Sequence, residues 1–359
     1  MKKEKRQNLR RKYLLTFLFI LLNVVVIALT ARAEFGNSKE AAELSEVSLN
    51  WWLLVPAVLC FLVALTLDIH KYVLMIREMT EDKRTYKHRE ARRVARRTVL
   101  LGKYYDNITP AAVGGQPFQI FYMRKNSGLP KGDSTSIPIF GMISIQIAFI
   151  IIAFFCFLFG GLIKTNPTLL FTALIGLLFY AFWPVMVAGV SFFPKSTTRF
   201  LKFMVKILAK LKIVKRKNVA LEKVENEAEE YAKSVKMILK TRGLFFKVIL
   251  ISLIYNILIA MIPYFVLTAF GGNVGFISCF VITIAVMSAI YFIPTPGNSG
   301  AAEGTFFVVF SALSTGYVFW AMLVWRFFSY YIYIIMGLIT YLVMHFRKGR
   351  LDERRKEEK

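Results

Sequence analysis

Long apolar runs without a charged residue, separated by short charged blocks, dominate the pattern along this chain. Each run holds about 20 or more residues, which is enough to cross a hydrocarbon core of roughly 30 Å as a helix. The pattern therefore predicts membrane-spanning helices. The charged residues that bound the runs are Lys12 and Arg32, Glu46 and Asp68, Asp133 and Lys164, Lys164 and Lys195, and Lys247 and Glu303.

The predicted fold class is all-α: a polytopic integral membrane protein with about six full transmembrane helices, forming one domain over residues 1–359. A composition that is 56% hydrophobic, with 33 phenylalanines, agrees with this class. The expected spanning helices are Tyr13–Thr30, Leu49–Tyr72, Ser136–Gly160, Thr168–Phe192, Gly243–Phe270 and Gly316–His345. The first of them also resembles a secretory signal, but its length favours a retained helix.

One pattern, Tyr-x3-Thr-Pro-x3-Gly-x6-Phe, occurs twice, at Tyr105–Phe121 and at Tyr291–Phe307. Both copies lie in surroundings too hydrophobic for an ordinary soluble loop, and Pro and Gly interrupt helices. Chance similarity between two turns is the alternative explanation. Helix-breaking elements at corresponding points of two hydrophobic halves are typical of transporters whose binding sites are made of broken helices.

The placement of basic residues predicts how the helices are oriented. Four segments are rich in Lys and Arg: the tail before Tyr13, Arg77–Lys103, Lys195–Arg242, and the tail after Phe346. The Ala31–Asn50 loop has two bases against four acids. Basic loops stay in the cytoplasm, so both termini are predicted to be cytoplasmic. The net charge of +25 then faces anionic headgroups at one membrane face, and no nucleic-acid partner is expected.

The number of membrane crossings between the basic loops predicts that each motif region is a hairpin that enters and leaves the membrane on the same side. Residues 100–131 begin and end in the cytoplasm, whereas residues 273–315 begin and end outside. The two motif copies are therefore predicted at the tips of oppositely oriented re-entrant hairpins, related as an inverted repeat. The cytoplasmic loop at 195–242 is predicted to be amphipathic and to lie on the inner leaflet, as is the basic part of Arg77–Lys103.

Polar residues at the two tips form the candidate site, because non-helical backbone at membrane depth must be buried in protein or line a wet cavity. The half-helix after each tip presents N–H groups and a positive dipole end, which suit a phosphate headgroup. Capping of the broken helices is the competing role. The candidate headgroup-binding residues are Asp106, Asn107, Thr109, Gly114, Gly115, Gln116, Gln119, Thr295, Gly297, Asn298, Gly300, Glu303, Arg326 and Asp68.

Charged residues inside the predicted membrane region have two possible roles, because buried ions either pair or face a cavity. Arg326 lies ten residues into the last expected helix, roughly 15 Å along its axis. It either pairs with Glu303 and holds the bundle together, or it contacts a headgroup phosphate. Asp68 is either interfacial or part of the cavity. The sequence shows no catalytic constellation, metal-ligand cluster or cofactor motif.

Two strings carry a family resemblance: Lys103-Tyr-Tyr-Asp-Asn-Ile-Thr-Pro-Ala-Ala-Val-Gly-Gly-Gln-Pro-Phe-Gln119, and Thr295-Pro-Gly with Gly300-Ala-Ala-Glu-Gly304. Together they resemble the lysylphosphatidylglycerol synthase transmembrane family. That family corresponds to the flippase-like membrane half of the bacterial multiple peptide resistance factor. The resemblance implies a protein of the bacterial plasma membrane that moves, or helps to make, positively modified phospholipid.

The function expected from this resemblance is translocation of phospholipid, including aminoacylated phosphatidylglycerol, linked to resistance against cationic antimicrobial peptides. In bifunctional relatives, lysyl transfer resides in a C-terminal soluble domain, whereas this chain ends at Lys359, shortly after its last expected helix. Enzymatic activity is therefore not expected. The alternatives are a phosphatidylglycerol lysyltransferase, which uses lysyl-tRNA, and a non-lipid solute transporter. The expected partners are anionic phospholipid and a separate lipid-modifying synthase, without a cofactor.

Overall fold

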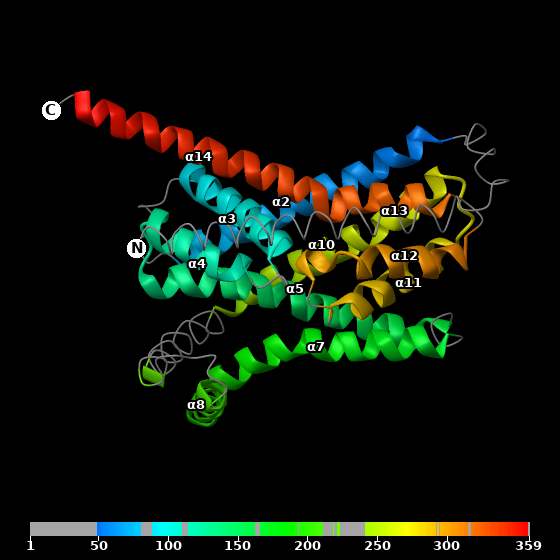
Figure 1. The fold of residues 1–359 in the computed structure, drawn as a ribbon, viewed down its shortest axis with the longest axis horizontal. Helices are drawn as coiled ribbons and strands as arrows, with labels where there is room; N and C mark the ends of the chain where they lie inside the picture. The colour runs from blue at the N-terminus through cyan, green and yellow to red at the C-terminus, as the bar shows by residue number, and fades with distance from the viewer. Residues whose placement is uncertain are drawn as a thin grey trace.

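The computed structural model is an all-α, polytopic membrane protein (Figure 1). It describes residues 49–79, 88–109, 114–161, 166–192, 194–210, 218, 221–222, 241–291, 293, 295–314 and 317–357. Within these residues all regular elements are helices. They are η2 Trp51–Leu53, α2 Leu54–Met79, α3 His88–Ile108, α4 Gly115–Asn126, α5 Lys131–Phe159, α7 Pro167–Phe192, α8 Pro194–Lys210, α10 Arg242–Ala269, α11 Phe276–Ile290, η4 Pro296–Asn298, α12 Ala301–Ser311, α13 Val318–Arg326, η5 Phe327–Tyr331 and α14 Ile332–Glu357.

Five helices of the described residues are long and apolar enough to cross a membrane. They are Trp51–Glu78, Gly132–Phe159, Pro167–Met186, Gly243–Ala269 and Val318–His345. Each corresponds to one of the spans predicted from the charge-free runs. The remaining predicted span, Tyr13–Thr30, lies outside the described residues.

The two motif regions form two helical hairpins, α3–α4 and α11–α12. Figure 1 shows that they extend into the bundle from opposite ends, with α3–α4 at the end where the C-terminus lies. The facing ends of α3 and α4, and those of α11 and α12, lie toward the middle of the bundle. The short helices α11 and α12 are apolar but have fewer than 18 residues, so each falls short of a full span.

The basic segment before the first motif belongs to the hairpin itself. The sequence predicted a surface helix followed by a hairpin from residue 100, whereas α3 runs without interruption from His88 to Ile108. A stripe of small and apolar residues, including Ala91, Val94 and Ala95, is buried along it. The arginines between these positions stay exposed or half-buried, so one helix carries both a basic surface and the approach to the tip.

Close helix packing holds the last helix against the first hairpin. A Cβ on Gly337 of α14 would collide with Tyr104 and would come within 3.0 Å of the Leu100 carbonyl oxygen, both on α3. Glycine is therefore required for this approach. The segment between α13 and α14 is a π-helical turn, Phe327–Tyr331, directly after Arg326. π-Turns inside α-helices occur frequently at functional sites, and this one lies beside both hairpin tips, as the contacts below show.

Within the loop at 195–242, which is predicted to be amphipathic, α8 exposes the apolar side chains of Phe200, Phe203, Met204 and Ile207. Most of the remaining residues of this loop lie outside the described part of the chain. Large apolar side chains are also exposed along α5 and α7, as expected for helices whose outer faces meet lipid rather than water.

Candidate functional site

The tip of the second hairpin is built around a buried ion pair. Arg326 Nε donates to Glu303 Oε1 at 2.7 Å, and the two residues are 4% and 2% exposed. Arg326 Nη2 also donates to the Gly297 carbonyl oxygen and to Ser299 Oγ, each at 3.2 Å. Glu303 Oε2 accepts the Gly300 N–H at 2.7 Å. An arginine from α13 therefore holds both the tip backbone and the carboxylate that caps α12.

Left-handed backbone makes this tip possible. Gly297, Asn298 and Gly300 have φ values of 57°, 55° and 87°, a region that glycine adopts without the steric cost other residues meet. A Cβ on Gly297 would overlap the Tyr330 ring. Thr295 Oγ1 donates to the Ser299 carbonyl oxygen at 2.9 Å and closes the turn. The helix-breaking role predicted for this motif copy is thus present in the turn geometry.

The tip of the first hairpin is held by its own side chains. Thr109 Oγ1 donates to the Tyr105 carbonyl oxygen at 2.7 Å and accepts the Gly114 N–H at 2.9 Å. Asp106 Oδ1 accepts the Gly115 N–H at 2.9 Å, which places a carboxylate at the positive end of α4. Two N–H groups expected to be free for an anion are therefore occupied, and the capping role applies to Asp106 and Thr109.

Tyr330, in the π-turn, contacts both tips. Asn107 Nδ2 donates to the Tyr330 carbonyl oxygen, and Tyr330 Oη donates to the Asn107 carbonyl oxygen, both at 3.4 Å. Its ring lies against Gly297 and 4.6 Å from Arg326 Cζ. Asn107 and Gly297, which are 190 positions apart in sequence, are thereby brought together. Tyr330 was not among the candidate residues, because no local sequence pattern predicts a π-turn.

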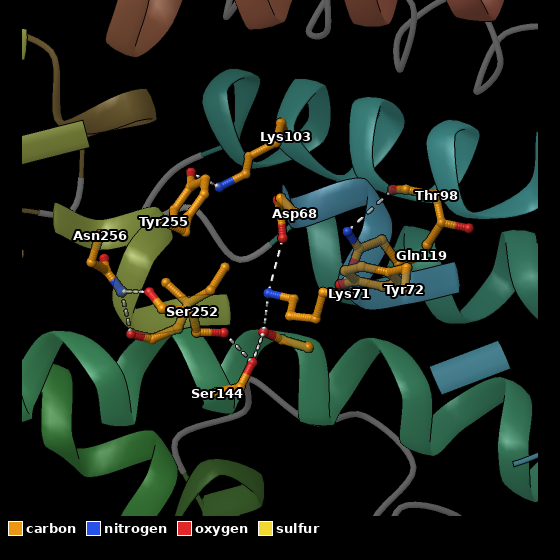
Figure 2. Close-up of polar contacts among 12 residues, drawn as sticks. Asp68, Lys71, Tyr72, Thr98, Lys103, Gln119, Ser144, Ser252, Tyr255 and Asn256 are labelled. Carbon is orange, nitrogen blue, oxygen red and sulfur yellow. Dashed lines mark hydrogen bonds and ion pairs between the residues drawn. The ribbon is translucent and has the colours of Figure 1, made fainter. Parts of the chain in front are cut away.

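A second buried ion pair is formed by Asp68 and Lys71, which both lie on α2 where this helix faces α5 (Figure 2). Lys71 Nζ lies 2.9 Å from Asp68 Oδ1 and donates to the Gly141 carbonyl oxygen at 3.1 Å. Asp68 is 2% and Lys71 0% exposed, so both side chains are buried within the helix bundle. The two residues are three positions apart on α2, a spacing that brings side chains together on one helix face.

Lys103 of α3 lies on the other side of Asp68. Figure 2 shows the Asp68 carboxylate between the ammonium groups of Lys71 and Lys103. Lys103 Nζ donates to Tyr255 Oη at 3.0 Å, and the Tyr255 and Tyr333 rings flank it, with centroids 5.2 and 5.6 Å away. Sequence reasoning missed these partners, although Lys103 opens the first motif string, because they come from helices distant in the sequence.

Of the two candidate glutamines on α4, Gln119 makes side-chain hydrogen bonds to two other helices. Gln119 Nε2 donates to the Thr98 carbonyl oxygen at 3.2 Å, and its Oε1 accepts from Tyr72 Oη at 3.2 Å (Figure 2). Gln119 thus links α4 to α3 and α2. Gln116 Oε1 is buried and makes no hydrogen bond within the described residues.

Further polar contacts join α5 to α10. Ser252 Oγ donates to Ser144 Oγ at 3.0 Å, and Asn256 Nδ2 donates to the Ile145 carbonyl oxygen at 3.1 Å. These contacts and the two ion pairs give the bundle a polar interior. Over the residues that the structure describes, no group of three or more His, Cys, Asp or Glu side chains could hold a metal ion.

The chain was compared with protein families, curated proteins and solved structures. A family model described as the lysylphosphatidylglycerol synthase TM region matches residues 13–337. This match confirms the resemblance carried by the two motif strings. No curated protein and no solved structure matched the chain.

Proposed function

The chain belongs to the lysylphosphatidylglycerol synthase transmembrane family, and on that basis we propose that it translocates phospholipid across the bacterial plasma membrane. Family membership supports a lipid-related function in the membrane. The proposed substrates are phospholipids, including aminoacylated phosphatidylglycerol. Exposure of the aminoacylated lipid on the outer leaflet would reduce the negative charge of that leaflet and thereby confer resistance to cationic antimicrobial peptides.

The observation that carries this proposal is the meeting of two hairpins that come from opposite ends of the bundle (Figure 1). Broken helices whose ends meet near the bilayer midplane form the binding sites of alternating-access transporters. Tyr330 contacts both tips, through Asn107 on one side and Gly297 on the other. An element that touches both hairpins can couple the opening of one to the closing of the other.

Polar and charged groups in the bundle interior support a lipid with a hydrophilic headgroup as the cargo. A headgroup that leaves water needs compensating charges and hydrogen bonds inside the protein. The candidate residues at both tips would provide them, and the Glu303–Arg326 pair would open so that Arg326 meets the headgroup phosphate. Arginine suits that contact because its planar guanidinium can bind phosphate through two parallel hydrogen bonds.

The proposed topology places both termini and α8 on the cytoplasmic side. The exposed apolar stripe of α8 at Phe200, Phe203 and Ile207, beside lysines such as Lys206, suits insertion into an anionic leaflet. Such a helix would gather anionic phospholipid near the entrance of the first hairpin. A separate synthase is proposed to supply the aminoacylated lipid.

A proteoliposome assay tests the proposal. The full chain is reconstituted with fluorescent phosphatidylglycerol in the inner leaflet, and exposure is followed by quenching with an impermeant reductant. Faster exposure than in protein-free liposomes and in liposomes that contain the Glu303→Gln/Arg326→Gln chain supports translocation by this site. Equal exposure in all three preparations would refute it.

Phosphatidylglycerol lysyltransferase activity is the second candidate, because the matched family carries the word synthase in its description. The same purified chain is incubated with lysyl-tRNA and phosphatidylglycerol. We expect no lysylated lipid above background. A product that increases with protein concentration would reverse the order of the two candidates.

A further inference from the structure

Lys103 is a cation whose hydrogen-bonding capacity is mostly unused. It lies on α3, three residues before Asp106 of the first tip, and is only partly buried. Its Nζ donates one hydrogen bond to a described residue, to Tyr255 Oη at 3.0 Å. An ammonium group has three N–H donors. Two of them therefore have no acceptor among the residues that the structure describes.

The two carboxylates that act on Lys103 electrostatically, Asp68 and Asp106, are engaged elsewhere. Asp68 pairs with Lys71 at 2.9 Å, and Asp106 Oδ1 accepts the Gly115 N–H at 2.9 Å. Within the described ranges, no carboxylate oxygen lies within the 4.0 Å ion-pair distance of Lys103 Nζ. The positive charge of Lys103 thus lacks a counter-ion in direct contact.

Lys71 is a useful contrast, since it lies on the far side of the same carboxylate. It is completely buried and makes both an ion pair with Asp68 and a hydrogen bond to the Gly141 carbonyl oxygen. The charge of Lys71 is therefore satisfied within the protein, whereas Lys103 keeps N–H donors without an acceptor in the described part of the chain. Tyr333 also lies beside Lys103, but its hydroxyl interacts with Tyr255 and is therefore not a free donor.

We propose that Lys103 Nζ, through its two unused N–H donors, binds the phosphate group of a phospholipid at the first hairpin. This inference rests on the proposed translocation, because a phospholipid phosphate is the anion that such a protein must desolvate. The flanking rings of Tyr255 and Tyr333 keep the ammonium charged and in place through cation–π contact. Inorganic phosphate shares the same chemistry, and the experiment separates the two sources.

The experiment measures binding of dihexanoyl phosphatidylglycerol, below its micellar concentration, to the detergent-solubilised full chain. Three variants are compared with the wild type: Lys103→Met, Lys103→Arg and Lys125→Met. Lys125 is an exposed lysine of α4 and serves as the matched control. Losing a hydrogen bond to a charged group weakens binding by about tenfold or more. We expect that loss for Lys103→Met and changes of less than about twofold for the other two.

Inorganic phosphate is titrated in a second arm. Phosphatidylglycerol binding that depends on Lys103, together with no Lys103-dependent phosphate binding in the same concentration range, assigns the site to the lipid. Lys103-dependent binding of inorganic phosphate alone would overturn the lipid assignment. Equal lipid binding by the wild type and a folded Lys103→Met chain would overturn the inference altogether.

A third measurement needs no variant and covers the case in which Lys103→Met fails to fold. The wild-type chain is treated with an amine-reactive acylating reagent, with and without the short-chain lipid, and modification is quantified by mass spectrometry. We expect the lipid to protect Lys103 at least about fivefold and to leave Lys125 unprotected. Equal modification of Lys103 with and without lipid would contradict the proposal.

Failure of this inference and failure of the proposed function have different signatures. If the wild type exposes lipid in proteoliposomes but Lys103 neither binds nor is protected, only the phosphate contact is wrong. If Lys103 binds the lipid but no chain accelerates exposure, the phosphate contact stands and translocation is wrong.

Discussion

The two hairpin tips share one sequence pattern but are held by different chemistry. At the first tip, Thr109 and Asp106 bond to backbone groups of their own hairpin. At the second tip, the carboxylate of Glu303 caps α12 and is itself held by Arg326, which comes from another helix. The shared Thr-Pro and Gly positions set the turns. The residues between them decide whether a tip supports itself or depends on a neighbour.

This difference indicates that the two tips respond differently to change. The hydrogen bonds of Thr109 and Asp106 persist if the whole first hairpin moves, because their donors and acceptors move together, and of the hydrogen bonds described at this tip only the long Asn107–Tyr330 ones would break. The second tip cannot move relative to α13 without breaking contacts of Arg326 with Glu303, Gly297 and Ser299.

The largest expected effect is in cysteine labelling, which shows the membrane face from which each hairpin enters. In a chain whose Cys60, Cys156 and Cys279 are replaced by Ser, we introduce Lys125→Cys or Ala312→Cys, both at exposed positions. An impermeant maleimide added to intact cells should label the Ala312→Cys chain and leave the Lys125→Cys chain unlabelled until the cells are opened. Labelling of both from one face would remove the inverted relation on which the comparison depends.

The next effect is the loss of the arginine at the second tip. Arg326→Gln leaves Glu303 buried without its partner, so the free energy of unfolding should fall by about 3–5 kcal/mol. Thermal or denaturant unfolding in detergent measures this loss. Asp106→Asn is the matched change at the first tip. It should cost only about 1 kcal/mol because the amide oxygen still accepts the Gly115 N–H. Equal losses at the two tips would contradict the proposed contrast.

The double change Glu303→Gln/Arg326→Gln distinguishes a structural role of Arg326 from headgroup binding, because it removes both charges of the pair. We expect it to recover most of the stability lost in Arg326→Gln. If Arg326 meets the headgroup, the stable double variant should remain inactive in the proteoliposome assay. A stable double variant with full lipid exposure would restrict Arg326 to a structural role.

A smaller contrast is expected at the tip glycines. Gly297→Ala forces a side chain into left-handed backbone and against the Tyr330 ring, so we expect a loss of about 3 kcal/mol. Gly114 has φ −75°, and the three atoms nearest to its added Cβ all belong to the Thr109 side chain. We therefore expect about 1–2 kcal/mol for Gly114→Ala. Unfolding measured under the same conditions compares the two variants, and a reversed order would show that backbone strain does not govern the second tip.

The smallest contrast lies in the two motif threonines. Thr109→Val removes both the acceptor of the Gly114 N–H and the donor to the Tyr105 carbonyl oxygen. Thr295→Val removes one donated hydrogen bond, to the Ser299 carbonyl oxygen. We expect losses of about 2 and 1 kcal/mol, respectively. Hydrogen exchange of the tip amides provides a local readout, with faster exchange at Gly114 in the Thr109→Val chain.

The spanning helices could be predicted from the sequence because the length of a charge-free run determines whether it can cross the membrane. The predicted Gly243–Phe270, for example, is observed as Arg242–Ala269. The place of the basic part of α3 within the bundle could not be predicted in this way. Its dense arginines indicated a surface helix, while the buried stripe that carries the same helix into the bundle is made of small residues.

The polar interior could be predicted only in part. Glu303 and Arg326 were recognisable as charges in an apolar stretch, and the structure places them in an ion pair. Lys103 was visible only as a member of a motif string. Its aromatic neighbours Tyr255 and Tyr333 are more than 150 residues away. Such contacts depend on how helices cross, and residue spacing within one helix does not encode that geometry.

The π-turn at Phe327–Tyr331 has a consequence for the rotational phase of the last helix. A π-turn accommodates one more residue than an α-helical turn, so every position after it is rotated by about 100° relative to an uninterrupted α-helix. Gly337 meets α3 only in this rotated phase. If the full sequence formed a regular α-helix here, Gly337 would turn away from the Leu100 carbonyl by about 100°, whereas deleting one residue such as Ser329 would let a regular α-helix keep Gly337 in place. The π-turn thus sets the angular alignment between the site and the first hairpin.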